Sequence, residues 1–171
     1  MFKSFYPSEW IDSTYDIDFK ALKEKGYKGV VFDVDNTLVC HGAPQNEQSL
    51  KLINSLKEMG YGVLFLSNNK EPRVKSFNEA VNCQYIFKAG KPNPRNYLKA
   101  CEMLGTNKDN TLFVGDQLFT DVWGANKAGL FSILVKPIDK HEEIQIILKR
   151  KLEWFVLRAY KRKLRKEGKM K

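Results

Sequence analysis

Five short apolar runs are the feature that most limits what this chain can fold into. Each is apolar at successive positions, so both faces of a strand formed there would be buried, as in a parallel sheet covered by helices. The runs are GVVFD (29–33), YGVLFLS (61–67), the weaker QYIFKA (84–89), NTLFVGD (110–116) and FSILV (131–135).

Segments with helical spacing lie between these runs. In 46–59 the apolar side chains recur every three to four residues, and Gly60 is a typical helix stop. Similar patterns occupy 72–81, 94–104 and 121–128. Strand and helix therefore alternate, which predicts an α/β fold with a parallel sheet and right-handed crossovers. In such sheets ligands bind beyond the carboxyl ends of the strands.

The bulk composition fits one globular domain. The chain has 171 residues, 43% hydrophobic and 29% charged. No apolar run approaches the roughly 20 residues of a membrane-spanning helix, and the first ten residues lack the apolar core of a signal peptide. Three cysteines without a CxxC pair suit reduced thiols, and two histidines are too few for a histidine-based metal site. A cytoplasmic protein is expected.

Positive charge is concentrated at the C-terminus. The formal net charge is +9; residues 149–171 hold eleven Lys/Arg against two Glu, while 1–148 hold eighteen of each sign. The basic character therefore belongs to the tail. We expect a catalytic domain over 1–148 and a basic, helical C-terminal tail over 149–171.

The tail and the N-terminus each allow two interpretations. Segment 141–166 has a predicted apolar stripe with helical spacing, formed by Ile144, Ile147, Leu148, Leu152, Phe155 and Ala159. It fits either a helix docked on the sheet or a polybasic segment with aromatic anchors on an anionic membrane. Each Lys or Arg near such a surface would contribute ~1 kcal/mol to the free energy of membrane binding. The same charge would attract RNA, although no nucleic-acid fold signature is present. The aromatic residues of 1–27 either wrap the core or form a membrane-facing patch.

Carboxylates follow two of the expected strands. Asp33 and Asp35 follow the first, and Asp116 follows the fourth, with Asp121 five positions later. In a parallel sheet these four groups converge on one edge. They would repel strongly unless some take up protons or a cation neutralises them. A site with carboxylate ligands and no His or Cys indicates Mg²⁺.

A lysine and a serine point to the substrate class. Ser67 ends the second strand, and Lys91 precedes the fourth. An ammonium group beside a metal site needs an intervening anion, and a phosphoryl group fits because its oxygens accept from Lys, Ser and backbone N–H groups. Lys88 competes with Lys91 for this role, and Lys70 is a weaker competitor.

The carboxylate, serine and lysine motifs follow one another along the chain in the order seen in a known family. DVDNT (33–37), a strand ending in Ser67, then Lys91, then GDQLFTD (115–121) resemble the haloacid dehalogenase (HAD) phosphatase superfamily. The stretch GDQLFTDVWGANKAGLFSILVKPI resembles the YqeG family of HAD subclass IIIA, whose relatives include phosphatidylglycerophosphate phosphatases. The resemblance implies an α/β, three-layer Rossmann-like HAD fold with a central parallel sheet.

The resemblance also implies a role for each motif residue. Asp33 would be the nucleophile that forms an aspartyl-phosphate, and Asp35 the general acid and base. Mg²⁺ would be held by Asp33, the backbone carbonyl of Asp35, and Asp116, with Asp121 supporting that shell. The substrate's phosphoryl group would be bound by Ser67, Asn68 and Lys91, while Thr37 would order the loop.

The spacing of the motifs leaves no room for a large cap domain. Leu38 to Asn46 is one short loop, and Ser67 to Lys91 fits only a helix and a strand. An open site favours a large substrate. Together with the basic tail and the resemblance, it favours phosphatidylglycerophosphate at the inner face of a membrane. The protein would then be a peripheral membrane protein. The alternatives are a soluble phosphometabolite, a nucleic-acid end, or an RNA- or ribosome-binding module with little turnover. The sequence gives no indication of a dedicated protein partner.

Overall fold

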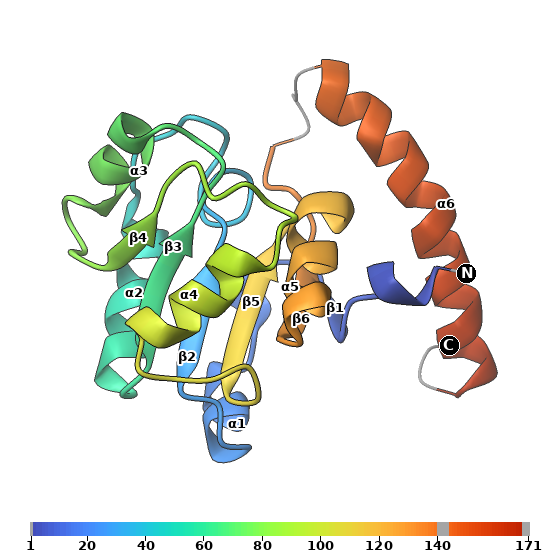
Figure 1. Ribbon diagram of the computed structural model, residues 1–171, viewed down its shortest axis with the longest axis horizontal. Helices are drawn as coiled ribbons and strands as arrows, with labels where there is room; N and C mark the ends of the chain where they lie inside the picture. The colour runs from blue at the N-terminus through green and yellow to red at the C-terminus, as the bar shows by residue number, and fades with distance from the viewer. Residues whose placement is uncertain (1, 140–143, 169–171) are drawn as a thin grey trace.

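The computed structural model describes residues 2–139 and 144–168, and its centre is a six-stranded parallel sheet (Figure 1). The strand order is β1-β6-β5-β2-β3-β4. All five predicted strands are confirmed. The strands are β1 (Glu9–Ile11), β2 (Gly29–Phe32), β3 (Gly62–Leu66), β4 (Gln84–Ile86), β5 (Thr111–Gly115) and β6 (Phe131–Val135).

Helices cover both faces of this sheet, which gives the three layers expected of the fold. Alternate residues of β2 point to opposite faces: Val30 and Phe32 pack with α1, α2 and α3, whereas Val31 packs with α4 and α5. The helices are α1 (Phe19–Glu24), α2 (Glu47–Glu58), α3 (Glu71–Asn78), α4 (Arg95–Met103), α5 (Trp123–Ala128) and α6 (Ile144–Lys166), with short turns η1 (Lys3–Phe5), η2 (Thr14–Asp16) and the π-helical η3 (Leu118–Val122).

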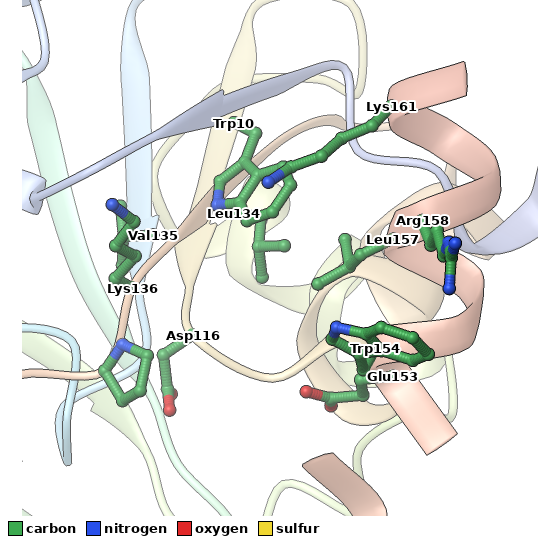
Figure 2. Close-up of a pocket in the computed structure, with 11 residues that line it drawn as sticks. Trp10, Asp116, Leu134, Val135, Lys136, Glu153, Trp154, Leu157, Arg158 and Lys161 are labelled. Carbon is green, nitrogen blue, oxygen red and sulfur yellow. The ribbon is translucent and has the colours of Figure 1, made fainter. Parts of the chain in front are cut away.

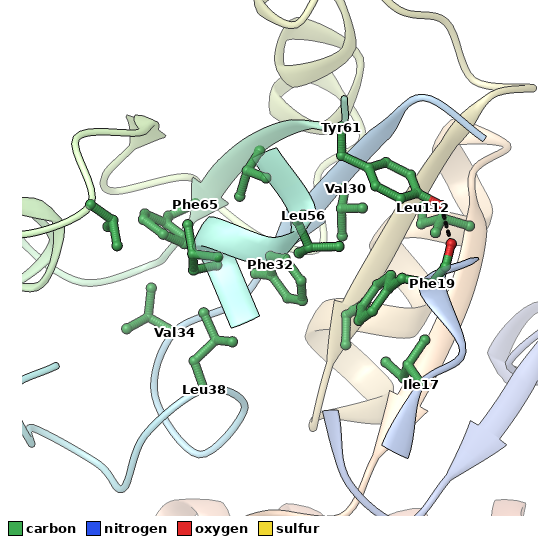
Figure 3. Close-up of a cluster of buried hydrophobic side chains, with 14 of the residues drawn as sticks. Ile17, Phe19, Val30, Phe32, Val34, Leu38, Leu56, Tyr61, Phe65 and Leu112 are labelled. Atoms are coloured by element: carbon green, nitrogen blue, oxygen red, sulfur yellow. Dashed lines mark hydrogen bonds between the residues drawn. The ribbon is translucent and has the colours of Figure 1, made fainter. Parts of the chain in front are cut away.

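The larger core lies on the face covered by α1 to α3. Figure 3 shows Phe32 and Phe65 side by side at its centre, with Phe19 and Tyr61 at one end. The Tyr61 hydroxyl donates to the backbone carbonyl of Phe19 at 2.8 Å, so this buried polar group is satisfied. The core holds β2 against α1 and α2, and β2 leads directly into the DVDNT motif.

The register of the central strands brings their carboxyl ends level. Phe32 of β2 is paired with Phe65 of β3 and with Val114 of β5. The residues that follow these positions therefore lie at one edge of the sheet. The hydrogen bond from the Asp33 N–H to the Val114 carbonyl, 2.9 Å long, continues the pairing of β2 with β5 to that edge.

The N-terminal segment mostly wraps the body, and it adds a strand that the sequence pattern does not predict. β1 pairs with β6 at the sheet edge, with Trp10 opposite Leu134. The ring of Tyr6 lies 5.1 Å from that of Tyr160 in α6, and Phe5 lies 5.3 Å from Phe119. Phe2 remains 40% exposed.

Helix α6 docks through a different face from the predicted apolar stripe. The buried residues of α6 share one side of the helix, which therefore faces the body; they are Glu153, Val156 and Tyr160. Leu152 and Phe155, which belong to the predicted stripe, are 57% and 62% exposed. Residues 141–143 of the predicted helix lie outside the described part of the chain. Among the described residues, no helix combines the length and apolar character needed to cross a bilayer.

No large cap domain interrupts the described chain between β2 and β4. The connection from β2 to β3 holds one loop and α2, and the connection from β3 to β4 holds α3. Both connections are described throughout, so the predicted absence of a cap is confirmed. No inserted domain therefore covers the carboxyl edge of the sheet from these two connections.

Candidate active site

The side chain of Lys91 joins two carboxylates at the carboxyl edge of the sheet. Its Nζ lies 2.6 Å from Oδ1 of Asp33 and 2.7 Å from Oδ1 of Asp121. All three residues are buried. Burial opposes the charge of Lys91, but Asp121 and Asp33 outweigh burial and raise its pKa, so the lysine is a stable ammonium group.

Asp116 brings a third carboxylate to the same place. Carboxylate oxygens of Asp33, Asp116 and Asp121 all lie within 4.8 Å of one another. Burial, opposed by Lys91, raises the pKa of Asp33 to about 7. Carboxylate oxygens held this close together can bind a divalent cation. The all-oxygen donor set suits a hard cation.

Local backbone structure explains how Asp121 reaches this cluster. Asp121 lies in the π-helical turn η3, directly after the β5 edge, and its Oδ2 accepts a 3.0 Å hydrogen bond from the Gln117 N–H. The end of β5 leaves space for it because residue 115 is glycine. A Cβ at Gly115 would lie 2.6 Å from Asp121 Oδ2. Gly115 therefore leaves the space that Asp121 occupies, and Asp116 beside it supplies a carboxylate to the cluster.

Asp35 is held apart from this cluster by a separate set of donors. Its Oδ1 accepts from the Gly42 N–H at 2.7 Å and from Arg73 Nη2 at 2.9 Å, and its Oδ2 accepts from Asn69 Nδ2 at 2.5 Å. The two carboxylates of the DVD motif therefore have different surroundings, as separate roles would require. Sequence reasoning missed Arg73, since no spacing rule links the first turn of α3 to the DVD loop.

Asn68 and Ser67 organise the loops around the predicted phosphate-binding lysine. Asn68 Oδ1 accepts from the Lys91 backbone N–H at 2.8 Å, and its Nδ2 donates to the Lys91 carbonyl at 3.3 Å. Ser67 Oγ accepts from the Asn69 N–H at 3.2 Å. Lys88 and Lys70, the competitors of Lys91, are exposed.

The DVD loop is tied to its surroundings by Thr37 and Asn36. Thr37 Oγ1 donates to Asp116 Oδ1 at 3.2 Å, which couples the loop to the β5 edge. Asn36 adopts a positive φ of 61°. Its backbone carbonyl accepts from the Ile138 N–H at 3.1 Å, and its Oδ1 accepts from the Asp139 N–H at 3.3 Å. The loop is thus linked to the segment that precedes α6.

A cavity of about 260 Å³ lies over these groups. The lining also includes His41, Gln117 and Thr120, which the sequence reasoning did not assign to the site. Asp116 and Asp121 are buried and do not form part of the lining. The predicted residues that do line the cavity are Asp33, Asp35, Ser67, Asn68 and Lys91.

Comparison with known proteins places this arrangement in a family. The family model for haloacid dehalogenase-like hydrolases matches residues 42–129, a range that contains Ser67, Lys91 and Asp116. The chain is 36% identical over 162 residues to the probable phosphatase YqeG of Bacillus subtilis, covering 94% of each. It is 27% identical to phosphatidylglycerophosphate phosphatase 1 of Arabidopsis thaliana, covering 86% of this chain and 45% of that protein.

Solved structures agree on the fold. The cobalt-bound deoxy-D-mannose-octulosonate 8-phosphate phosphatase of Haemophilus influenzae superposes with a TM-score of 0.52 at 16% identity, covering 66% of this chain and 70% of that one. A putative HAD family hydrolase from Streptomyces avermitilis gives 0.51 at 17% identity, covering 65% and 72%. The family model, the relative that aligns along almost the whole length, and the fold all agree. The chain is therefore a phosphatase that belongs to the haloacid dehalogenase-like hydrolases.

Proposed function

We propose that the protein is a Mg²⁺-dependent phosphatase that hydrolyses phosphatidylglycerophosphate to phosphatidylglycerol at a membrane surface, through an aspartyl-phosphate on Asp33. One observation carries the chemistry. The ammonium group of Lys91 lies between Asp33 and Asp121, in a buried cluster whose carboxylate oxygens, with those of Asp116, lie within 4.8 Å of one another. In such a cluster the ammonium group can bind an anionic phosphoryl group while the carboxylates bind a cation beside it.

Each carboxylate of the DVD motif takes one part of the reaction. The Asp33 carboxylate attacks phosphorus and the ester P–O bond breaks, while Asp35 gives a proton to the departing alcohol oxygen. Asp35 then accepts a proton from water as the water oxygen attacks the phosphoryl group, which releases phosphate and restores Asp33. Lys91 and the Ser67 hydroxyl offset the charge that builds on the phosphoryl oxygens.

The residues that would hold Mg²⁺ are Asp33, Asp116 and the backbone carbonyl of Asp35, with Asp121 supporting them. When bound, the ion would neutralise charge on the phosphoryl group and orient it. The clustering of buried carboxylate oxygens from Asp33, Asp116 and Asp121 within 4.8 Å of one another supports this assignment, because a bound cation stabilises like charges held together.

Three observations support a lipid substrate. The similarity to phosphatidylglycerophosphate phosphatase 1 extends over 86% of the chain. The site has no cap over residues 33–91, so a large carrier surface can approach it. Basic residues crowd the last 23 positions, where an anionic bilayer would attract them. In this proposal residues 1–148 perform the chemistry and 149–171 meet the membrane, which would make the protein peripheral on the cytoplasmic face.

The direct test compares substrates. Phosphate release is measured with Mg²⁺ on phosphatidylglycerophosphate in mixed micelles, on glycerol 3-phosphate, and on an oligonucleotide with a terminal phosphate. The lipid should give the highest kcat/KM. A higher value for either soluble ester would reject the lipid assignment, and no release from any ester would reject the proposed chemistry.

Two substitutions test the residues. Asp33→Asn should lower kcat on the order of 10³-fold or more, because the nucleophile is lost. Lys91→Met should also remove most activity, and Lys88→Met, which changes an exposed lysine three positions away, is its matched control. Equal effects of the two lysine substitutions would contradict the assignment of Lys91.

A further inference from the structure

A second cavity, of about 410 Å³, lies between α6 and the edge of the sheet formed by β1 and β6. This volume falls within the roughly 300–1,000 Å³ typical of small-molecule sites. Figure 2 shows Trp154 and Leu157 directed from the helix toward Leu134, while Trp10 lies on the β1 side. The wall is therefore largely aromatic and aliphatic.

This cavity adjoins the candidate active site. Asp116, one of the three clustered carboxylates, also lines the cavity (Figure 2). Glu153 lines it as well, and its Oε1 accepts a 2.8 Å hydrogen bond from the Leu118 N–H at the start of η3. The same turn carries Asp121. A molecule in the cavity would therefore extend from α6 to the metal-binding cluster.

Three basic side chains also line the cavity. Lys136, after the end of β6, is ion-paired with Asp12 at 2.7 Å, whereas Arg158 and Lys161 extend from α6. Lys161 Nζ lies 4.6 Å from the centre of the Trp10 ring, and the Arg158 guanidinium lies 5.2 Å from that of Trp154. An apolar wall with cations set on its aromatic side chains suits a ligand that is apolar along its length and anionic at its end.

The outer surface of α6 continues this character. Trp154 and Phe155 are 53% and 62% exposed, with ring centroids 5.0 Å apart. Lys151 and Arg162 are exposed one helical turn before Phe155 and two turns after it. An exposed aromatic pair flanked by basic residues suits the interface of an anionic bilayer, from which a lipid can be withdrawn.

We propose that the cavity between α6 and the β1–β6 edge binds the acyl-chain and glycerol portion of an anionic phospholipid, with its phosphate ester directed past Asp116 to Asp33 and Lys91. This inference rests on the proposed lipid substrate and deepens it. The basic tail then acts as one wall of the substrate site.

Trp10 provides a reporter inside the cavity. The chain has three tryptophans, so Trp123→Phe/Trp154→Phe leaves Trp10 as the only one. The probe is phosphatidylglycerol with short brominated acyl chains, kept monomeric below its critical micelle concentration, because bromine quenches tryptophan only at close range. Saturable quenching of Trp10 is expected, and none with glycerol 3-phosphate or with the unbrominated lipid. Absence of quenching by the brominated lipid would overturn the proposal.

Two charge reversals of equal size test the basic side chains. Arg158→Glu/Lys161→Glu changes the cavity wall, and Arg162→Glu/Lys166→Glu changes exposed residues of α6 outside the lining. The first pair should weaken binding of the monomeric lipid about tenfold or more, and the second by less than about twofold. Equal losses would show attraction to the tail as a whole and would overturn the proposal. Unfolding midpoints of both pairs should match wild type, which shows that α6 remains docked.

Binding and turnover separate this inference from the proposed function. The same titration is made in an Asp33→Asn background, where no ester is consumed. If the brominated lipid quenches Trp10 there while the wild-type protein releases no phosphate from phosphatidylglycerophosphate, the cavity assignment holds and the proposed function fails. If the wild-type protein hydrolyses phosphatidylglycerophosphate and Trp10 is not quenched, the function holds and the cavity assignment fails.

Discussion

The guanidinium of Arg73 lies against the carboxylate of Asp35, with Nη2 2.9 Å and Nε 3.3 Å from the same oxygen. Arg73 lies in the first turns of α3, and Asp35 lies in the loop after β2, so this contact joins two of the motif-bearing connections. The guanidinium also stacks 5.8 Å from the Phe77 ring, which limits its movement. Arg73 therefore fixes where the proposed general acid points.

Replacing Arg73 should affect ester cleavage according to the leaving group. Arg73→Ala is expected to lower kcat on alkyl phosphates about tenfold to hundredfold, because Asp35 loses the cationic positioning contact among its hydrogen bonds from Gly42, Asn69 and Arg73. The loss should be much smaller with p-nitrophenyl phosphate, whose leaving group departs without a proton. Arg95→Ala, at an exposed arginine of α4, is the control. A loss of equal size on both substrates would contradict the positioning role.

The space at the end of β5 gives a second prediction. Gly115→Ala should displace Asp121, since the new Cβ would lie 2.6 Å from its carboxylate and Cβ atoms. We expect a loss of about 1–3 kcal/mol in the free energy of unfolding, together with weaker metal dependence of activity. Gly62→Ala, at the start of β3 and so at the opposite edge of the sheet, is the comparison. Its new Cβ would lie 3.1 Å from the flexible Leu104 side chain. Urea unfolding and Mg²⁺ titration of activity measure both effects.

Removal of metal should change stability as well as activity. The clustered carboxylates of Asp33, Asp116 and Asp121 repel one another when no cation is bound. Adding Mg²⁺ to chelator-treated protein at a hundred times its dissociation constant should stabilise the folded state by about 2.7 kcal/mol. The rise in melting temperature should disappear in Asp116→Asn. A rise that survives in this variant would place the ion elsewhere.

A buried carboxylate contributes to the docking of α6 beside the apolar contacts of Val156 and Tyr160. Glu153→Ala should lower the free energy of unfolding by about 1–3 kcal/mol, because the Leu118 N–H loses its 2.8 Å partner. Glu153→Gln keeps an acceptor and should lose less. Limited proteolysis within α6 reports whether the helix has left the body. Equal stability of the two variants would show that this hydrogen bond does not hold the helix.

Much of the fold follows from hydrophobic pattern. β2, β3, β5 and β6 are apolar at successive positions because both faces are covered, and such runs are visible without a structure. β1 is different: its three residues are half-buried at the sheet edge, and their order along the chain carries no period. Its position depends on pairing with β6, which is more than 100 residues away.

The candidate site divides in the same way. Asp33, Asp116 and Lys91 could be predicted because each stands at a strand end or in an ordered motif. Arg73 could not, since its contact with Asp35 depends on how α3 packs. The apolar stripe predicted for α6 also failed to show its docked face, because Glu153 is buried through a hydrogen bond and Phe155 remains exposed. Hydrophobic periodicity cannot register a buried carboxylate of this kind.

Asn36 has a mechanical consequence. Its backbone and side-chain oxygens accept hydrogen bonds from the N–H groups of Ile138 and Asp139, so the residues that follow β6 are bound to the loop that begins at Asp33. A displacement of residues 138–139 is therefore expected to reach this loop through the two hydrogen bonds. The position of these residues and the geometry around Asp33 should change together.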